Sequence, residues 1–367
     1  MKLFSGFLQT PLRMAIPLAV VVLGAIGGCS SQTEPQAESS ATPAPQAESS
    51  VAPDAKPVQI TLVTYAVTKS AYEKIVPLFA EQWKAKTGQT VTIEQSYGGS
   101  GSQTRAVIDG LEADVVSLAL ALDTGKIEKA GLIEPGWEGE LPNESIVTRS
   151  VAALVMRDAS LNIKGWADLA GDNIQVITAN PKTSGGARWN FLGLWGSVTQ
   201  AGKSEADAKA FVDKVFKNTP ILPKDAREAS DVFFKQGQGN VLINYENEVL
   251  LAKKEGETLP YVVPLDYNIS IDNPVTVVDT NVDKHGTREV SEAFVEFLFT
   301  PEAQRIFADA GFRPVDEAVS TEFAAQYPKV EKLFTVTDLG GWKTVQEKFF
   351  EDGAEFDQMQ SRIGKSF

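Results

Sequence analysis

The sequence has 367 residues and a formal net charge of −14 at pH 7, with 48 acidic against 34 basic residues. The length allows two or three domains with a substantial core, and 43% hydrophobic residues is ordinary for a folded protein. Without excess positive charge we expect no nucleic-acid partner. Cys29 and His285 are the single cysteine and histidine. A disulfide framework, a thiolate or imidazole metal site and a Cys–His catalytic pair therefore lack their residues, and we expect neither metal nor cofactor.

Residues 1–28 are predicted to be a lipoprotein signal peptide. Lys2 and Arg13 precede an apolar stretch over residues 14–28, which is shorter than the roughly 20 residues of a spanning helix. The stretch ends in Ile26-Gly27-Gly28-Cys29, which resembles a bacterial lipobox, a motif whose cysteine becomes lipidated. The alternatives are an uncleaved anchor or an incidental cysteine.

Residues 29–57 are predicted to be a disordered tether. They are rich in Ser, Pro, Ala, Gln and Glu, and the hexapeptide Pro-Gln-Ala-Glu-Ser-Ser occurs at both 35–40 and 45–50. Such a composition cannot bury enough apolar surface to fold. Signal, lipid and tether together predict a periplasmic protein held at a membrane by a lipid anchor.

From residue 58 onward the chain alternates between strand and helix patterns. Apolar or β-branched runs predict strands at residues 58–65, 91–95, 113–118, 151–156, 174–178, 240–244 and 274–278. Helical spacing of apolar residues predicts helices from Tyr72 to a stop at Gly88, and at residues 103–111, 187–198, 205–217, 288–299 and 301–310. This α/β alternation is typical of parallel sheets with right-handed crossovers.

One large α/β domain is the simpler interpretation, but we favour two lobes. Lobe I is expected to comprise residues 58–148 and 275–367, and lobe II residues 149–274. The chain would cross between the lobes twice, near residues 148–155 and 270–278.

Small residues occupy several turns between a strand and the following helix. They follow the first, second and fifth predicted strands, at residues 65–68, 96–102 and 180–188. Glycine lets the main chain approach a ligand closely, and a helix N-terminus presents unpaired N–H groups with partial positive charge. Together they can bind an anion without a lysine, at the sheet edge where open α/β sheets bind ligands. The alternative for any one loop is a tight turn and nothing more.

Nucleotide and hydrolase interpretations lack their key residues. The run Gly99-Ser100-Gly101-Ser102-Gln103-Thr104 lacks the last glycine of a dinucleotide fingerprint, and neither glycine loop ends in the Gly-Lys-Ser/Thr of a P-loop. A hydrolase built on Ser184 would have only His285 as base, and that histidine falls in a polar turn where we expect it to be exposed. We therefore expect no enzyme and no catalytic residue.

The chain resembles the bacterial sulfate-binding proteins that deliver sulfate to an ABC importer, along nearly the whole folded part. The longest shared run is Lys182-Thr183-Ser184-Gly185-Gly186-Ala187-Arg188-Trp189. Other shared runs are Gly98-Gly99-Ser100-Gly101, residues 110–115, Val241-Leu242-Ile243 with Glu246-Asn247-Glu248, and residues 283–287. The resemblance implies an α/β, two-lobed periplasmic-binding-protein fold of type 2, in which two sheets flanked by helices close on a dehydrated anion.

The resemblance also implies the site. The residues expected to contact the anion are Ala66 and Ser100 from lobe I, and Ser184, Gly185, Gly186, Ala226 and Tyr245 from lobe II. Main-chain N–H groups would act at most of them, with the hydroxyls of Ser184 and Tyr245. Arg188 and Arg227 are expected behind the site, where they would brace the loops.

Two positions depart from the family pattern and leave the ligand open. Ala66 stands where an acidic residue is common, and Tyr245 stands where the sulfate binders usually have tryptophan. The thiosulfate binders also lack that indole, so thiosulfate or another tetrahedral oxyanion is the alternative ligand to sulfate. An envelope enzyme or a sensor without a transporter is the distant alternative. The expected partners are sulfate and the membrane permease of the importer, and the expected state is a monomer.

Overall fold

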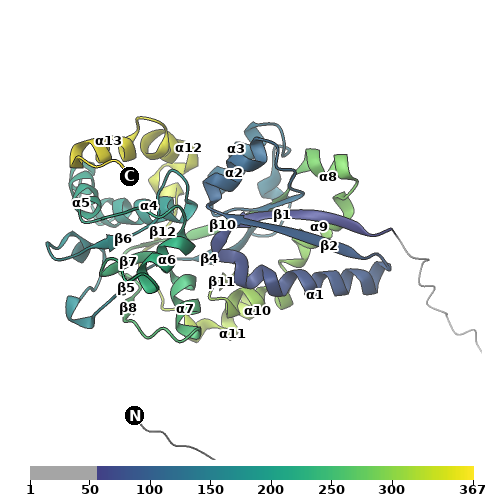
Figure 1. The fold of residues 1–367 in the computed structure, drawn as a ribbon, viewed down its shortest axis with the longest axis horizontal. Coiled ribbons are helices and arrows are strands. Elements are labelled where there is room, and N and C mark those ends of the chain that lie inside the picture. The colour runs from purple at the N-terminus through teal and green to yellow at the C-terminus, as the bar shows by residue number, and fades with distance from the viewer. Residues whose placement is uncertain (1–55) are drawn as a thin grey trace, which may run out of the picture. The chain divides into compact units, whose positions relative to one another are not determined.

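The computed structural model describes residues 56–367. The predicted signal peptide, Cys29 and the tether as far as residue 55 lie outside these residues. Two sheets organise the described part (Figure 1). We call the part built on the larger sheet the first half and the part built on the smaller sheet the second half.

The first half contains a mixed six-stranded sheet with the strand order β11–β4–β10–β3–β1–β2. Its strands are β1 (Val58–Tyr65), β2 (Val91–Gly98), β3 (Val115–Ser117), β4 (Ile146–Ser150), β10 (Ile271–Val277) and β11 (Arg313–Pro314). β1 pairs in parallel with β2 and β3, as predicted. β10 runs antiparallel to β3 and β4, so the sheet is mixed rather than parallel throughout. β10 enters the sheet directly from the second half, without the crossover helix that would set its direction.

The second half contains a four-stranded sheet with the order β6–β7–β5–β8. Its strands are β5 (Ala152–Met156), β6 (Val176–Ile177), β7 (Val241–Tyr245) and β8 (Tyr261–Val262). β5 is antiparallel to β7 and β8, whereas β6 is parallel to β7. A separate parallel pair joins β9 (Asn268–Ile269) to β12 (Leu333–Phe334).

The six predicted helices are present close to their predicted ranges, and residues 56–367 contain seven more that were not predicted. In chain order they are α1 (Lys69–Thr87), α2 (Ser100–Ile108), α3 (Ala121–Lys129), α4 (Gly185–Thr199), α5 (Glu205–Lys217), α6 (Ala226–Phe234), α7 (Glu246–Lys254), α8 (Asp279–His285), α9 (Arg288–Phe297), α10 (Pro301–Asp309), α11 (Glu317–Glu322), α12 (Gly341–Val345) and α13 (Glu355–Ile363). α1 ends at Gly88, whose φ of 75° suits glycine. No helix within residues 56–367 is long and apolar enough to cross a lipid bilayer.

Two extended segments carry the chain between the halves, both inside the predicted ranges. Val151 alone separates β4 from β5, and Ser270 alone separates β9 from β10. The side chain of Asn268 ties the two segments together, because it accepts from Ala152 N at 3.2 Å and donates to Ala152 O at 2.9 Å. Two of the connections between the halves are therefore adjacent extended strands, an arrangement that suits hinge closure.

The C-terminal segment corrects the expected lobe boundaries. After β11 the chain passes a third time to the second half, where α13 lies beside α5 (Figure 1). There β12 pairs with β9, and Arg362 of α13 forms two hydrogen bonds with Asp213 of α5 at 2.7 and 2.8 Å. The assignment of residues 275–367 to lobe I is thus wrong from residue 333 onward. The physical reason lies in α4, which is buried on nearly all sides and needs cover. Phe349 and Phe350 supply it by packing against Phe191.

His285 is exposed, as predicted, and its ring is held between two carboxylates. Its Nδ1 lies 2.9 Å from Asp114 Oδ1, and its Nε2 lies 2.9 Å from Glu112 Oε2. These hydrogen bonds raise the pKa of His285 above its ordinary value. Asp114 also accepts from Thr61 N and the Thr287 hydroxyl, so the histidine joins β1 to the turn before α9.

We expect His285 to stabilise the fold in a pH-dependent way. Its folded pKa lies above its unfolded pKa of about 6.5, so the stabilisation is fully present below that value and is lost as pH rises through the folded pKa. The difference in unfolding free energy between the wild type and His285→Gln should therefore shrink from about pH 6 upward. Urea denaturation across pH measures it, and Lys284→Gln is the control. A difference that does not change with pH would contradict this role.

Candidate anion-binding site

A small cavity lies where the two halves meet. Its volume is only about 10 Å³. The lining residues are Tyr65, Ala66, Val67, Gly98, Gly99, Ser100, Ala119, Ser184, Gly185, Gly186, Asp225, Ala226 and Tyr245. Every residue predicted to contact the anion is among them. The structure therefore brings together, at one point, residues from both halves that lie far apart in the sequence.

The N-terminus of α4 faces this cavity. Gly185 and Gly186 are the first residues of the helix, and Ser184 is its N-cap. The Ser184 hydroxyl accepts a hydrogen bond from Ala187 N at 3.3 Å, which leaves its own proton free to be donated. Because the first N–H groups of a helix have no intrahelical partner, α4 presents main-chain donors to the cavity.

Other main-chain segments end at the same place. Ser100 begins α2 and Ala226 begins α6, so both carry N–H groups of a helix N-terminus. Ala66 begins a short 3₁₀ helix directly after β1. The hydroxyl of Ser100 is already engaged, since it donates to Asp123 Oδ2 at 2.8 Å and accepts from Ala119 N at 3.1 Å. Ser100 can therefore offer the cavity its main-chain N–H rather than its side chain.

Glycine is required at the cavity because atoms of other elements occupy the space of a side chain. A Cβ on Gly186 would lie 2.6 Å from Cε2 of Tyr245, and a Cβ on Gly185 would lie 2.6 Å from Cβ of Ala119. A Cβ on Gly99 would lie 2.6 Å from the carbonyl oxygen of Thr183 in the opposite half. The glycines thus allow the main chains of the two halves to approach each other.

Within the described residues that line the cavity there is no Lys or Arg, and Asp225 is the one charged residue. Asp225 is the N-cap of α6, and its Oδ1 accepts from Glu228 N at 2.9 Å. The described residues also contain no His, Cys, Asp and Glu cluster that could hold a metal ion. The cavity therefore offers an anion oriented amides and hydroxyls rather than cations.

Arg188 lies behind the cavity, bound to the main chain and to a buried acid. Its Nη1 lies 2.5 Å from Asp123 Oδ1, and its Nε donates to Pro181 O at 2.9 Å. Burial alone would raise the pKa of Asp123, but Arg188, Lys126 and the Ser100 hydroxyl hold it below its ordinary value. This pair links α4 of the second half to α3 of the first, and it fixes both the loop before α4 and Ser100.

Arg227 also lies outside the cavity lining. Its Nη2 donates to Glu248 Oε1 at 2.7 Å and lies 3.5 Å from Val67 O in the first half. Burial raises the pKa of Glu248, while Arg227 and the Ser230 hydroxyl oppose that rise. Both arginines are therefore paired with carboxylates and lie outside the cavity lining.

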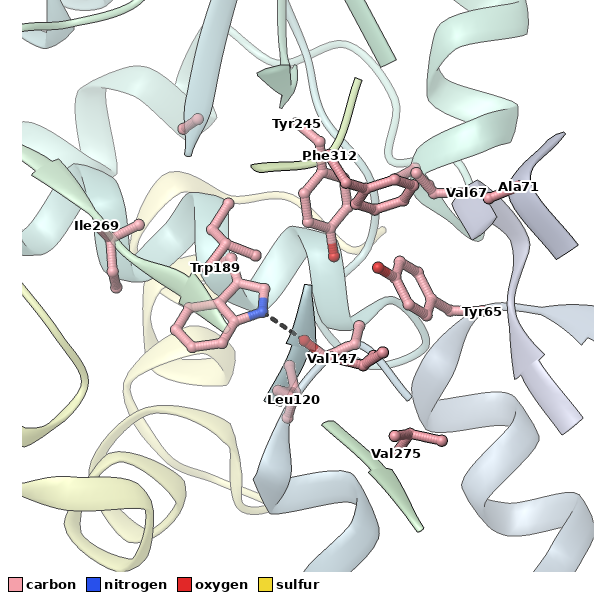
Figure 2. Close-up of a cluster of buried hydrophobic side chains, with 14 of the residues drawn as sticks. Tyr65, Val67, Ala71, Leu120, Val147, Trp189, Tyr245, Ile269, Val275 and Phe312 are labelled. Atoms are coloured by element: carbon pink, nitrogen blue, oxygen red, sulfur yellow. Dashed lines mark hydrogen bonds between the residues drawn. The ribbon is translucent and has the colours of Figure 1, made fainter. Parts of the chain in front are cut away.

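Two residues of the site were missed by sequence reasoning. Tyr65 lines the cavity with its side chain fully within the interior, although the sequence placed it at the end of the first strand, next to Ala66. Asp123 positions Ser100 and Arg188, but an acid inside a predicted helix carries no sequence signal that it will be buried. Tyr245 lies opposite Tyr65, with the ring centroids 6.1 Å apart (Figure 2).

Residues 60–313 match the family of bacterial extracellular solute-binding proteins. The chain belongs to this family. Members are extracytoplasmic proteins of the bacterial envelope, which agrees with the periplasmic location predicted from the sequence.

Similarity to individual members extends over almost all of this solute-binding protein. It is 61% identical over 352 residues to the sulfate-binding protein of Synechocystis sp., covering 95% of this chain and 96% of that one. It is 37% identical over 302 residues to the thiosulfate-binding protein of Pseudomonas aeruginosa, covering 82% and 91%. The solved sulfate-binding protein SubI of Mycobacterium tuberculosis H37Rv is 35% identical, with a TM-score of 0.73, over 80% of this chain and 100% of SubI.

The Arg227–Glu248 pair generates a stability prediction for this solute-binding protein. Arg227→Met leaves Glu248 buried without its cation, and the unfolding free energy should fall by roughly 2–3 kcal/mol near neutral pH, less than for a fully buried pair because Arg227 is partly exposed. Because protonation then neutralises Glu248, part of the loss should be recovered on lowering the pH. Urea denaturation measures both effects.

The matched control is Lys235→Met, at the other end of α6. Lys235 pairs with Asp231 at 2.7 Å, but its side chain is 76% exposed, so its removal should leave the unfolding free energy nearly unchanged. Equal effects of the two substitutions would show that Glu248 is not desolvated in solution.

Proposed function

We propose that this protein captures sulfate between its two halves and delivers it to the membrane permease of an ABC importer. The observation that carries the proposal is the cavity, where main-chain donors and hydroxyls of both halves converge without any cation. The names of the relatives support the ligand, because proteins 61% and 35% identical to this chain are sulfate-binding proteins.

In this proposal each predicted contact residue donates a hydrogen bond to the anion. The N–H groups of Ala66, Ser100, Gly185, Gly186 and Ala226 donate to sulfate oxygens. The hydroxyls of Ser184 and Tyr245 add two side-chain donors. Arg188 and Arg227 do not touch the anion; they hold the amide-bearing loops in place through Asp123 and Glu248.

A site built only from donors favours a fully ionised anion. Sulfate carries two charges and no proton near neutral pH, so every oxygen can accept hydrogen bonds. Hydrogen phosphate carries a proton that needs an acceptor. Asp225 is the one carboxylate among the described lining residues, and its Oδ1 caps α6. Donors therefore outnumber acceptors in the site, which favours sulfate over phosphate.

Closure couples binding to transport. An anion that contacts both halves stabilises the closed arrangement and shifts the hinge equilibrium toward it. The permease then recognises the closed form. The protein acts as a monomer without catalytic activity, and a lipid on Cys29 with the tether over residues 29–57 keeps it near the membrane.

Thiosulfate is the second candidate ligand, favoured by one residue. Tyr245 has a smaller ring system than the tryptophan usual in sulfate binders, which leaves more room for a terminal sulfur atom. The 37% identity to a thiosulfate-binding protein agrees with this possibility. Sulfate remains first because the relatives of higher identity are sulfate-binding proteins.

Titration calorimetry of residues 56–367 against sulfate, thiosulfate, molybdate and phosphate decides between these ligands. We expect sulfate to bind most tightly and phosphate to give no measurable heat at neutral pH. Tighter binding of thiosulfate would reverse the order of the two candidates. No heat with any of these oxyanions would falsify the proposed function.

Substituting Gly186 should abolish capture of the anion. The side chain of Gly186→Val would meet the buried ring of Tyr245, displacing it from the cavity and blocking the main-chain donors. We expect the sulfate affinity to fall about 100-fold or more, as measured by calorimetry.

Gly125→Val is the control for this experiment. Gly125 lies in α3, where an added Cβ meets no atom within 4 Å, so this variant should bind sulfate like the wild type. Unchanged affinity in Gly186→Val would mean that the anion binds elsewhere.

A further inference from the structure

Two tyrosines enter the cavity from opposite halves. Tyr65 is the last residue of β1 in the first half, and Tyr245 is the last residue of β7 in the second. Their exposed fractions are 3% and 1%. Figure 2 shows the two hydroxyls pointing toward one another from these strands. The ring centroids are 6.1 Å apart and the ring planes are tilted by 40° rather than stacked.

Within residues 56–367, neither hydroxyl has a hydrogen-bond partner, although both are buried. Thr148 neighbours the Tyr65 hydroxyl, but the two hydroxyls do not meet hydrogen-bond geometry; the Thr148 hydroxyl donates to Asn273 Oδ1 at 3.2 Å. Tyr72 provides the contrast: it is equally buried in the first half, and its hydroxyl donates to Ser117 Oγ at 2.7 Å. The unpartnered hydroxyls are therefore a feature of the cavity and not of buried tyrosines in this chain.

Both phenols are suited to donate to an anion. Burial raises the pKa of Tyr65 and of Tyr245 well above the ordinary value, so both keep their protons throughout the physiological range. A buried hydroxyl without a partner is unfavourable, and a hydrogen bond to an ionised acceptor relieves that penalty most strongly. An acceptor between the two rings would therefore satisfy both hydroxyls.

We propose that Tyr65 is a second phenol donor to the bound oxyanion, opposite Tyr245, and that the pair makes closure of the halves depend on the anion. The inference rests on the proposed function and extends it to a residue outside the predicted contact set. While the halves are apart, water solvates both hydroxyls. Closure removes this water, and the anion replaces it as acceptor. Closure without an anion would leave both donors unpaired, so the open form prevails.

The first test is sulfate affinity. Tyr65→Phe keeps the ring and removes only the donor, so we expect the dissociation constant for sulfate to rise about 10- to 100-fold. Tyr72→Phe is the matched control and should bind like the wild type.

The melting temperature without sulfate gives a second readout. Tyr65→Phe should retain the melting temperature of the wild type, because it breaks no protein hydrogen bond, whereas Tyr72→Phe should melt lower. Affinity of Tyr65→Phe within twofold of wild type would overturn the contact.

The second test is closure without the anion, by small-angle scattering of the double variant Tyr65→Phe/Tyr245→Phe. We expect its radius of gyration in sulfate-free buffer to be smaller than that of the wild type, and the wild type to contract to the same value on adding sulfate. An unchanged radius in the double variant would overturn the coupling. A wild type that binds no oxyanion would overturn the proposed function instead, and the sulfate-free comparison would still decide the role of the hydroxyls.

Discussion

The close approach of main chain from both halves at one cavity is the constraint on which the rest of the structure depends. Gly99 lies against Thr183 of the opposite half, and Gly185 lies against Ala119. Any side chain at these positions would hold the halves apart. The helices α2, α4 and α6 can therefore bring their N-termini together, and two single-residue connections at Val151 and Ser270 let the halves meet there.

Charge is arranged so that the cavity gains a local positive field without a cation. Arg188 and Arg227 are each paired with a buried carboxylate behind the loops. Each carboxylate neutralises its arginine, so neither arginine presents a net positive charge to the cavity. Main-chain N–H groups at helix N-termini supply the field instead. A net charge of −14 is therefore no obstacle to an anionic ligand, because net charge does not report the orientation of amides over a few ångströms.

Helix α4 connects this chemistry to the fold. Its first turn supplies Gly185 and Gly186 to the cavity, while its body is buried nearly all round. Phe349 and Phe350 of the C-terminal segment complete that burial. The segment thus stabilises the helix that carries most of the proposed contacts, even though it lies outside the cavity itself. The ring of Tyr245 packs against Gly186, so the end of β7 contacts the N-terminus of α4.

The sequence by itself determined the helices α1, α2, α4, α5, α9 and α10, the strands β1–β3 and the glycine loops of the cavity, since helical spacing, capping and glycine turns act over a few neighbouring positions. Only the tertiary structure decided the direction of β10, the place of the C-terminal segment and the pairing of Arg188 with Asp123, 65 residues away. It alone also showed that the hydroxyls of Tyr65 and Tyr245 are buried without partners. These features depend on which surfaces meet when the halves pack together. The residues around a position in the sequence do not indicate which distant residue it will contact.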